Sequence, residues 1–152
     1  MNKKIVLDFI DAINEHNVDK ICNLMSDDHK FIDAQGNEVT GKEKMRTGWT
    51  GYFEWFPDYK IEITDIFEKR EDSRLVHLPK GHIIKMGDVR YDFIVAFGFA
   101  SGTFGSEPPN DKNHFLLPAS WKAIIEGGKI KLWQVYCDTK IPFDIIERNR
   151  KR

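Results

Sequence analysis

The sequence has little that would tie it to a metal centre or a disulfide framework. It contains two cysteines among 152 residues, Cys22 and Cys137, and their spacing is not that of a zinc or redox motif. We expect both to be reduced side chains that pack as small hydrophobic residues. No HExxH pattern or pairing of histidines occurs either, so the sequence predicts no metal and no cofactor.

Charge and hydropathy argue against two further classes. The 23 Lys and Arg residues balance 24 Asp and Glu residues, which leaves no basic excess to neutralise phosphates. No window approaches the ~18 uninterrupted apolar residues of a membrane span, and the N-terminal residues lack the apolar core of a signal peptide. We therefore expect no nucleic-acid partner, no membrane insertion and a cytoplasmic location. The basic cluster at 148–152 is expected to be a solvated end.

Large aromatic side chains, by contrast, are abundant. Eleven Phe, four Trp and four Tyr occur in a chain whose residues are 41% hydrophobic. The length fits a single domain spanning 1–152. So many rings in a small chain predict either a thick core or an aromatic-lined cavity.

The first part of the chain has the periodicity of helices. Apolar residues recur at helical spacing over 3–15, and Asn17 is placed to cap a second, short helix. A break is expected at 26–28 and a short strand at 30–33. Thr40 and Glu43 have the spacing of a capping box, which predicts a third helix that Pro57 ends.

From residue 59 the apolar period changes to two, which is typical of strands. Strands are predicted at 59–64, 91–104, 114–126 and 129–138, with a Gly127-Gly128 hairpin turn before the last. This order predicts an α+β fold in which helices cover one face of a curved antiparallel sheet. On the strand at 91–104 one face carries small residues, including Gly98 and Ala100, which allow a close approach or leave room for a cavity. Residues 70–90 predict an inserted hairpin or a mobile flap.

Two segments carry a family resemblance. Residues 24–33 end a helix in an acidic pair and lead through a short strand to Asp33, and residues 118–138 form a hairpin with a Gly-Gly turn. In this order they resemble the SnoaL-like and ketosteroid-isomerase-like branch of the nuclear transport factor 2-like superfamily. The resemblance implies a cone-shaped antiparallel sheet packed on three N-terminal helices, as in cystatin-like folds. It also implies a deep pocket for a small apolar molecule, with or without catalysis.

The resemblance assigns candidate catalytic residues only in part. Asp33 matches the isomerase general base, but Phe9 and Ser120 occupy the positions of its two acidic oxyanion donors, so steroid isomerisation by that apparatus is not expected. Asp138 matches the late-strand aspartate of the SnoaL-like cyclases. Either carboxylate has an alternative role: Asp33 as a turn cap and Asp138 as a cap of the following bend. His29 is expected at the surface.

Pocket walls and an outer surface follow from the same resemblance. Phe9 is expected to contact the ligand from the first helix, Trp49 and Phe53 from the third helix, and Ser120 and Tyr136 from the sheet. Trp121 and Trp133 have the opposite strand phase. If Ser120 and Gln134 face the pocket, the two Trp residues lie on the outer face, through which a homodimer is expected. The sequence thus leaves two hypotheses: cofactor-independent acid–base chemistry on a carbonyl compound, or non-catalytic binding.

Overall fold

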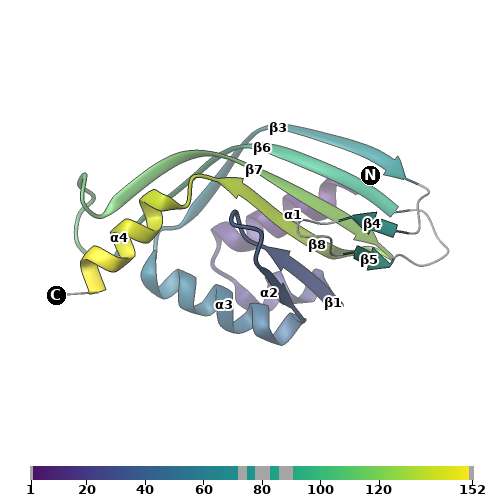
Figure 1. Ribbon diagram of the computed structural model, residues 1–152, viewed down its shortest axis with the longest axis horizontal. Coiled ribbons are helices and arrows are strands. Elements are labelled where there is room, and N and C mark those ends of the chain that lie inside the picture. The colour runs from purple at the N-terminus through teal and green to yellow at the C-terminus, as the bar shows by residue number, and fades with distance from the viewer. Residues whose placement is uncertain (1, 72–74, 78–82, 86–90, 151–152) are drawn as a thin grey trace.

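The computed structural model describes residues 2–71, 75–77, 83–85 and 91–150 and has the predicted α+β architecture. The chain runs through α1 (Lys3–Asn14), α2 (Val18–Asn23), β1 (Met25–Ile32), β2 (Glu38–Thr40), α3 (Lys42–Trp55), β3 (Lys60–Glu71), β4 (Leu75–His77), β5 (Ile83–Lys85), β6 (Tyr91–Thr103), β7 (His114–Glu126), β8 (Lys129–Cys137) and α4 (Lys140–Arg150). Helices α1, α2 and α3 lie under a curved sheet, and α4 stands at one end of it (Figure 1).

The main sheet has six strands in the order β2-β1-β8-β7-β6-β3. All neighbours are antiparallel except β1 and β8, which pair in parallel with Phe31 opposite Trp133. The run of strands after α3 is antiparallel, as predicted, whereas the parallel pairing of β1 with β8 was not predicted. Alternation along one strand shows which residues share a face, but it does not show the direction of the neighbouring strand. The register places Phe31 and Trp133 on the same, concave face.

Helix α1 packs its apolar stripe against this concave face. Its buried residues are Val6, Phe9, Ile10, Ala12 and Ile13. The Asn14 side chain ties the end of the helix to β3, because it donates to the Ile61 carbonyl at 2.9 Å and accepts from the Ile61 N–H at 2.8 Å. The helix is therefore held to the sheet by two side-chain-to-backbone hydrogen bonds as well as by packing.

The predicted helix caps have different outcomes. Asn17 caps α2 as expected, since its side chain accepts from the Lys20 N–H. The capping box at Thr40 and Glu43 is wrong: Gly41 is the N-cap of α3, with φ at 109° and no side-chain cap bond. Thr40 is instead held in β2, where its hydroxyl accepts from the Lys30 ammonium at 2.9 Å. Strand pairing therefore uses the residue that would have capped the helix.

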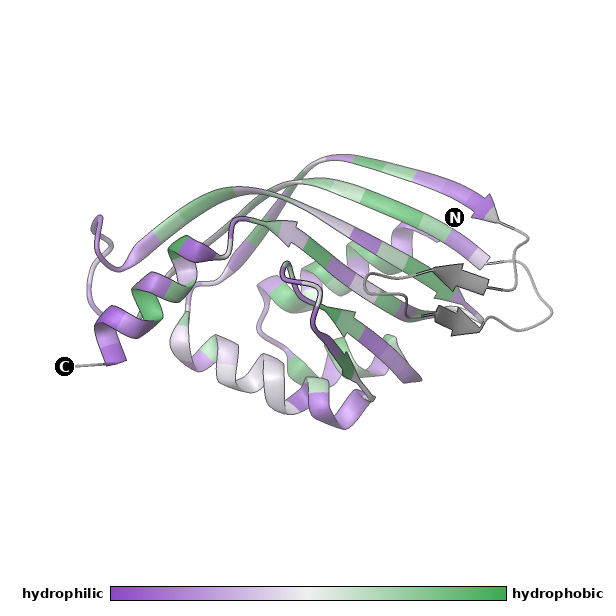
Figure 2. Cartoon of the chain, viewed as in Figure 1, coloured by the Kyte–Doolittle hydropathy of each residue, from purple (hydrophilic) through white to green (hydrophobic). Residues whose placement is uncertain are grey.

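The C-terminal part of the chain forms a fourth helix that the sequence did not predict. Helix α4 buries Pro142, Ile145 and Ile146. The guanidinium of Arg150 lies 6.0 Å from the centre of the Trp55 ring on α3. In Figure 2 this helix alternates hydrophilic and hydrophobic residues, whereas hydrophobic residues predominate in the middle of the long strands. Arg148 and Arg150 of the basic cluster are thus part of a packed amphipathic helix.

Residues 70–90 include a small separate sheet. Strands β4 and β5 pair in antiparallel fashion, with Leu75 opposite Lys85 and His77 opposite Ile83, as a hairpin insertion would. The rest of the predicted insertion, at 72–74, 78–82 and 86–90, lies outside the described residues.

A close backbone approach explains Gly98. Strand β3 has a register shift between Ile63 and Asp65, and a Cβ atom built on Gly98 would lie 1.8 Å from the Glu62 carbonyl oxygen. Only glycine fits there without moving β3. The small-residue face predicted for 91–104 thus serves a close approach at this position.

Candidate functional site

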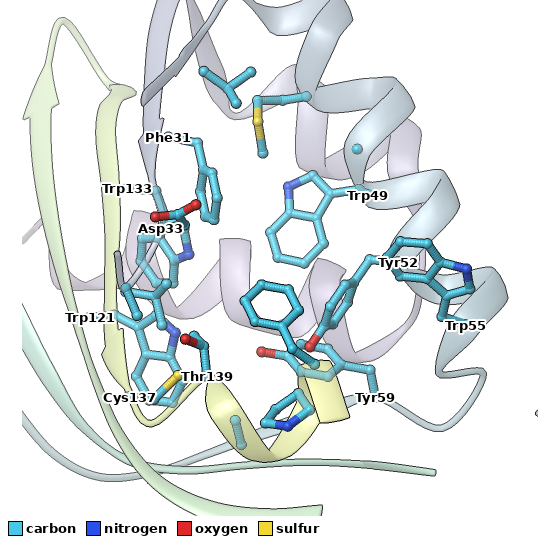
Figure 3. Close-up of a pocket in the computed structure, with 18 of the residues that line it drawn as sticks. Phe31, Asp33, Trp49, Tyr52, Trp55, Tyr59, Trp121, Trp133, Cys137 and Thr139 are labelled. Atoms are coloured by element: carbon cyan, nitrogen blue, oxygen red, sulfur yellow. The ribbon is translucent and has the colours of Figure 1, made fainter. Parts of the chain in front are cut away.

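A cavity of about 310 Å³ lies between α3, the concave face of the sheet and α4 (Figure 3). Its walls are mostly aromatic and aliphatic. The lining residues are Phe31, Asp33, Ala34, Val39, Lys44, Met45, Gly48, Trp49, Tyr52, Trp55, Tyr59, Ala100, Phe115, Leu117, Trp121, Trp133, Val135, Cys137, Thr139, Pro142, Phe143 and Ile146. Ala100 adds little volume to the sheet wall, so the small-residue face of β6 also leaves room for this space.

Two tryptophans form the floor of the cavity. Trp121 and Trp133 are 2% and 1% exposed and stack at 6.5 Å between ring centres. Phe9 lies behind them, 5.0 Å from the Trp133 ring. The placement of both Trp residues on the outer face is wrong. On β8 the two phases carry one ring each, Trp133 and Tyr136, but on β7 the phase of Trp121 is apolar and the phase of Ser120 includes Lys122 and Glu126, so the pattern of β7 already indicated the buried phase.

Ser120 and Tyr136 have the opposite strand phase to the two Trp residues and lie on the outer face of the sheet. They pair with one another across β7 and β8, and neither lines the cavity. Tyr136 is 48% exposed. The structure therefore separates these two predicted substrate contacts from the pocket they were expected to line.

Asp33 lines the cavity and also holds the turn that follows β1. Its Oδ1 accepts from the backbone N–H groups of Gln35 and Asn37, both at 2.9 Å. Its Oδ2 accepts from the Asn37 side-chain amide at 3.1 Å. Figure 3 shows the carboxylate beside Phe31 and Trp133. The position of Asp33 is thus compatible with both roles considered for it, catalytic base and turn cap.

Asp138 does not join Asp33. Its side chain is exposed, and its Oδ1 accepts from the backbone N–H of Lys140 at 2.9 Å, at the start of α4. The geometry is that of the predicted alternative, a cap of the bend. The neighbouring residues Cys137 and Thr139 line the cavity in its place.

Helix α3 supplies the wall opposite the sheet, but its two predicted contacts differ. Trp49 lines the cavity; its indole N–H is buried and has no hydrogen-bond partner in the described structure. Phe53 lies behind it and stacks on the His16 ring at 4.0 Å with an interplanar angle of 7°. Phe53 supports the wall without lining the cavity, as Phe9 does on the sheet side.

Two tyrosines that the sequence did not single out for hydrogen bonding reach the cavity. Tyr52 comes from α3 and Tyr59 from the turn before β3, and their rings meet edge to face at 5.0 Å. Figure 3 shows both hydroxyl groups directed into the cavity. Burial, and secondarily Cys137, raises the pKa of Tyr52 above its usual value. Burial also raises the pKa of Tyr59 well above its usual value, so both phenols keep their protons at neutral pH.

His29 is buried, contrary to its predicted surface position. It is 0% exposed, and its Nδ1 lies 2.7 Å from the Ile130 carbonyl oxygen. A carbonyl only accepts, so Nδ1 carries the proton and the buried Nε2, which has no partner among the described residues, does not. Burial lowers the pKa of His29 from 6.5 to about 4. The ring is therefore neutral at physiological pH.

The cysteines, possible metal ligands and possible membrane-spanning helices were also considered in the sequence. Both cysteines are free, and burial raises the pKa of the Cys137 thiol in the cavity wall. Across the described residues, no three His, Cys, Asp or Glu side chains are grouped to hold a metal ion. Among the helices described, none is long and apolar enough to cross a membrane.

This combination of a curved six-stranded sheet, three helices beneath it and an apolar cavity defines a cone-shaped domain with an internal pocket. Residues 6–104 match the SnoaL-like domain. The chain therefore belongs to the SnoaL-like family, within the nuclear transport factor 2-like superfamily. No curated protein sequence matches it.

Solved structures share the fold at low sequence identity. A candidate SnoaL-like polyketide cyclase from Shewanella denitrificans has 12% identity and a TM-score of 0.68, covering 97% of each chain. A nuclear transport factor 2-like protein of unknown function from Cytophaga hutchinsonii has 15% identity and a TM-score of 0.61, covering 94% of this chain and 95% of that one. A protein with a ketosteroid isomerase-like fold from Catenulispora acidiphila, in complex with trimethylamine, has 18% identity and a TM-score of 0.62, covering 87% and 83%.

Proposed function

We propose that the protein binds a small, largely apolar molecule in the cavity between α3, α4 and the sheet. The observation that carries this proposal is an aromatic-walled space of about 310 Å³ in which few polar groups converge. At the ~30 Å³ that a water molecule occupies in the liquid, this space holds on the order of ten non-hydrogen atoms. A compound the size of a substituted naphthalene is a suitable probe.

Binding is tested with 2-ethylnaphthalene, which has no polar atom. Tryptophan fluorescence should report binding, because Trp49, Trp121 and Trp133 line the cavity. The titration should saturate at one molecule per chain. Isothermal titration calorimetry gives an independent stoichiometry. Fluorescence that changes only linearly with probe concentration, with no saturable heat, would contradict the proposal.

A second candidate function is acid–base catalysis with Asp33 as the base. Asp33 is the carboxylate among the residues that line the cavity. In such a reaction its carboxylate would take a proton from the carbon next to a carbonyl, and the C–H electron pair would move to the carbonyl oxygen as an enolate. Return of a proton to carbon completes the cycle without a cofactor.

Hydrogen exchange tests this chemistry without a known substrate. In D₂O, the protein should accelerate deuterium incorporation next to the carbonyl of 1-tetralone, followed by mass spectrometry. Asp33→Asn is a suitable variant because its amide oxygen can still accept from Gln35 and Asn37, as Oδ1 does now. The exchange rate should fall by about 10²–10³ in that variant. An unchanged rate would show that Asp33 is not the base and leave binding as the function.

The outer sheet face supports a further proposal, that two copies of this chain associate through it. The outer patch consists of Phe67, Phe97, Phe99 and Leu116, all substantially exposed, with Phe67 and Leu116 at 60% and 61%. Phe67 and Phe97 meet edge to face at 6.2 Å across β3 and β6. An isologous dimer would place this patch against itself and remove it from water. Analytical ultracentrifugation should find a dimer; a monomer at micromolar concentration would contradict the proposal.

A further inference from the structure

The cavity contains a pair of hydrogen-bond donors that its apolar walls do not satisfy. Within the described part of the chain, the hydroxyls of Tyr52 and Tyr59 have no hydrogen-bond partner, and both point into the same space (Figure 3). Hydroxyls that face a cavity and have no protein partner bond either water or a ligand atom, so a ligand that displaces the water must supply a polar atom in its place. The required atom is an acceptor.

Both tyrosines are held in place by groups outside the cavity. The turn that carries Tyr59 is fixed by its own N–H, which donates to the Phe56 carbonyl at 3.0 Å, and by its carbonyl, which accepts from His16 Nε2 at 2.9 Å. His16 is in turn stacked on Phe53. Tyr52 is on the rigid α3 helix, and its ring packs against Phe56 at 5.2 Å. The donors are therefore pre-positioned, which lowers the cost of ordering them when a ligand binds.

Both hydroxyls act as donors at neutral pH, since burial raises the pKa of each phenol. One oxygen with two lone pairs, such as a carbonyl or enolate oxygen, can accept from both donors at once. An alkene, which has no lone pair, cannot accept from either donor. The donors come from α3 and the turn after it, whereas Phe9 and Ser120 of α1 and β7 offer no such group to the cavity.

We infer that Tyr52 and Tyr59 form a two-donor site that binds the carbonyl oxygen of a small aromatic or alicyclic ketone. This inference rests on the proposed binding function and specifies its ligand class. Asp33 lies in the wall made by β1 and the turn after it, across from α3. A ketone anchored at the tyrosines would extend its apolar body toward the Trp121 and Trp133 floor.

A matched pair of probes tests the donor site. 2-Acetylnaphthalene and 2-isopropenylnaphthalene have the same shape, but only the first has a carbonyl oxygen in place of the terminal CH₂. The wild-type protein should bind the ketone about 20-fold more tightly than the alkene, as expected for two neutral hydrogen bonds. Tyr52→Phe and Tyr59→Phe should each weaken ketone binding about fivefold and leave alkene binding unchanged. The double variant should bind both probes equally.

The control is Tyr136→Phe, which makes the same chemical change on an exposed residue outside the cavity. It should retain the full ketone preference. The infrared C=O stretch of the bound ketone provides a second measurement: it should shift to lower frequency in the wild type and return toward its value in alkane solvent in the double variant. Circular dichroism of each variant establishes that it is folded.

The outcomes separate this inference from the proposed function. Equal affinity for ketone and alkene in the wild type overturns the donor site but leaves the apolar cavity as the binding site. A loss of affinity for both probes in the Tyr→Phe variants also overturns it, because the rings would then act through packing alone. If neither probe binds to the wild type, the proposed function fails as well, and the donor site fails with it.

Discussion

The two faces of the same sheet are both rich in aromatic residues, yet one lines a cavity and the other is exposed. On the concave face, Trp121 and Trp133 are almost fully buried and form the floor of a cavity. On the outer face, Phe97 and Tyr136 are 45% and 48% exposed. Hydrophobic content therefore does not distinguish a pocket wall from an outer surface in this protein. The distinction depends on which face the helices cover, and substitutions on each face can test it.

Gly98 on the concave face should be the most sensitive position. Gly98→Ala places a Cβ where the Glu62 carbonyl lies at 1.8 Å, so β3 must move away. We expect a loss of about 3 kcal/mol or more in the free energy of unfolding, measured by urea denaturation. Gly51→Ala on α3 is the control, because nothing lies within 4 Å of its added Cβ. That variant should gain ~0.5–1 kcal/mol in the free energy of unfolding. Equal effects at the two positions would contradict the close approach of β3 to Gly98.

His29, beneath the concave face, should make the protein sensitive to acid. Its pKa falls from 6.5 in the unfolded chain to about 4 in the fold. Between these values the unfolded chain binds a proton that the folded chain excludes, so stability is full above about pH 6.5 and falls as the pH drops toward 4. The loss at pH 4 should be about 3 kcal/mol from this residue. His29→Asn keeps a donor for Ile130 without titrating.

Urea denaturation at pH 7, 6, 5 and 4.5 measures this effect. The wild type should lose stability more steeply than His29→Asn over that range, with the two curves separating below pH 6.5. Parallel curves would mean that His29 is protonated equally in both states, and that its burial does not cause the acid sensitivity.

Neighbouring residues on β6 allow the two faces to be compared directly. Ala100 lines the cavity, whereas Ser101, the next residue, has the opposite phase. Ala100→Leu should weaken binding of 2-ethylnaphthalene about tenfold, or ~1.4 kcal/mol, because its side chain fills part of the space. Ser101→Leu should bind the probe as the wild type does. Similar losses in both variants would place the probe outside the cavity.

The smallest effect on stability is expected on the outer face. Phe97→Lys puts a charge in the outer patch, opposite Asp65 of β3, and should change the free energy of unfolding by no more than ~0.5 kcal/mol. It should nevertheless convert the proposed dimer into a monomer in sedimentation equilibrium. Leu7→Lys, at another exposed apolar residue on α1, should leave the dimer intact. Dissociation by both substitutions would argue against an interface on the sheet.

The sequence by itself determined most of the elements. Helical periodicity located α1 and α3, the change to a period of two located β3, β6, β7 and β8, and Asn17 marked the start of α2. These predictions succeeded because each depends on residues that are close along the chain. It also identified the SnoaL-like family and placed Asp33 at the wall of the cavity.

Only the tertiary structure decided that the small-residue phase of β6, and not the phase of Phe97 and Phe99, faces the pocket. The parallel pairing of β1 with β8, the packing of α4 against α3, and the helices under one face together put the Trp phase inside. Periodicity located α3 and β3, but it did not show that the turn between them brings the rings of Tyr52 and Tyr59 together. Local sequence marks the buried face where one phase is polar, as on β7, and contacts between segments far apart in the chain assign the face where both phases are apolar, as on β6.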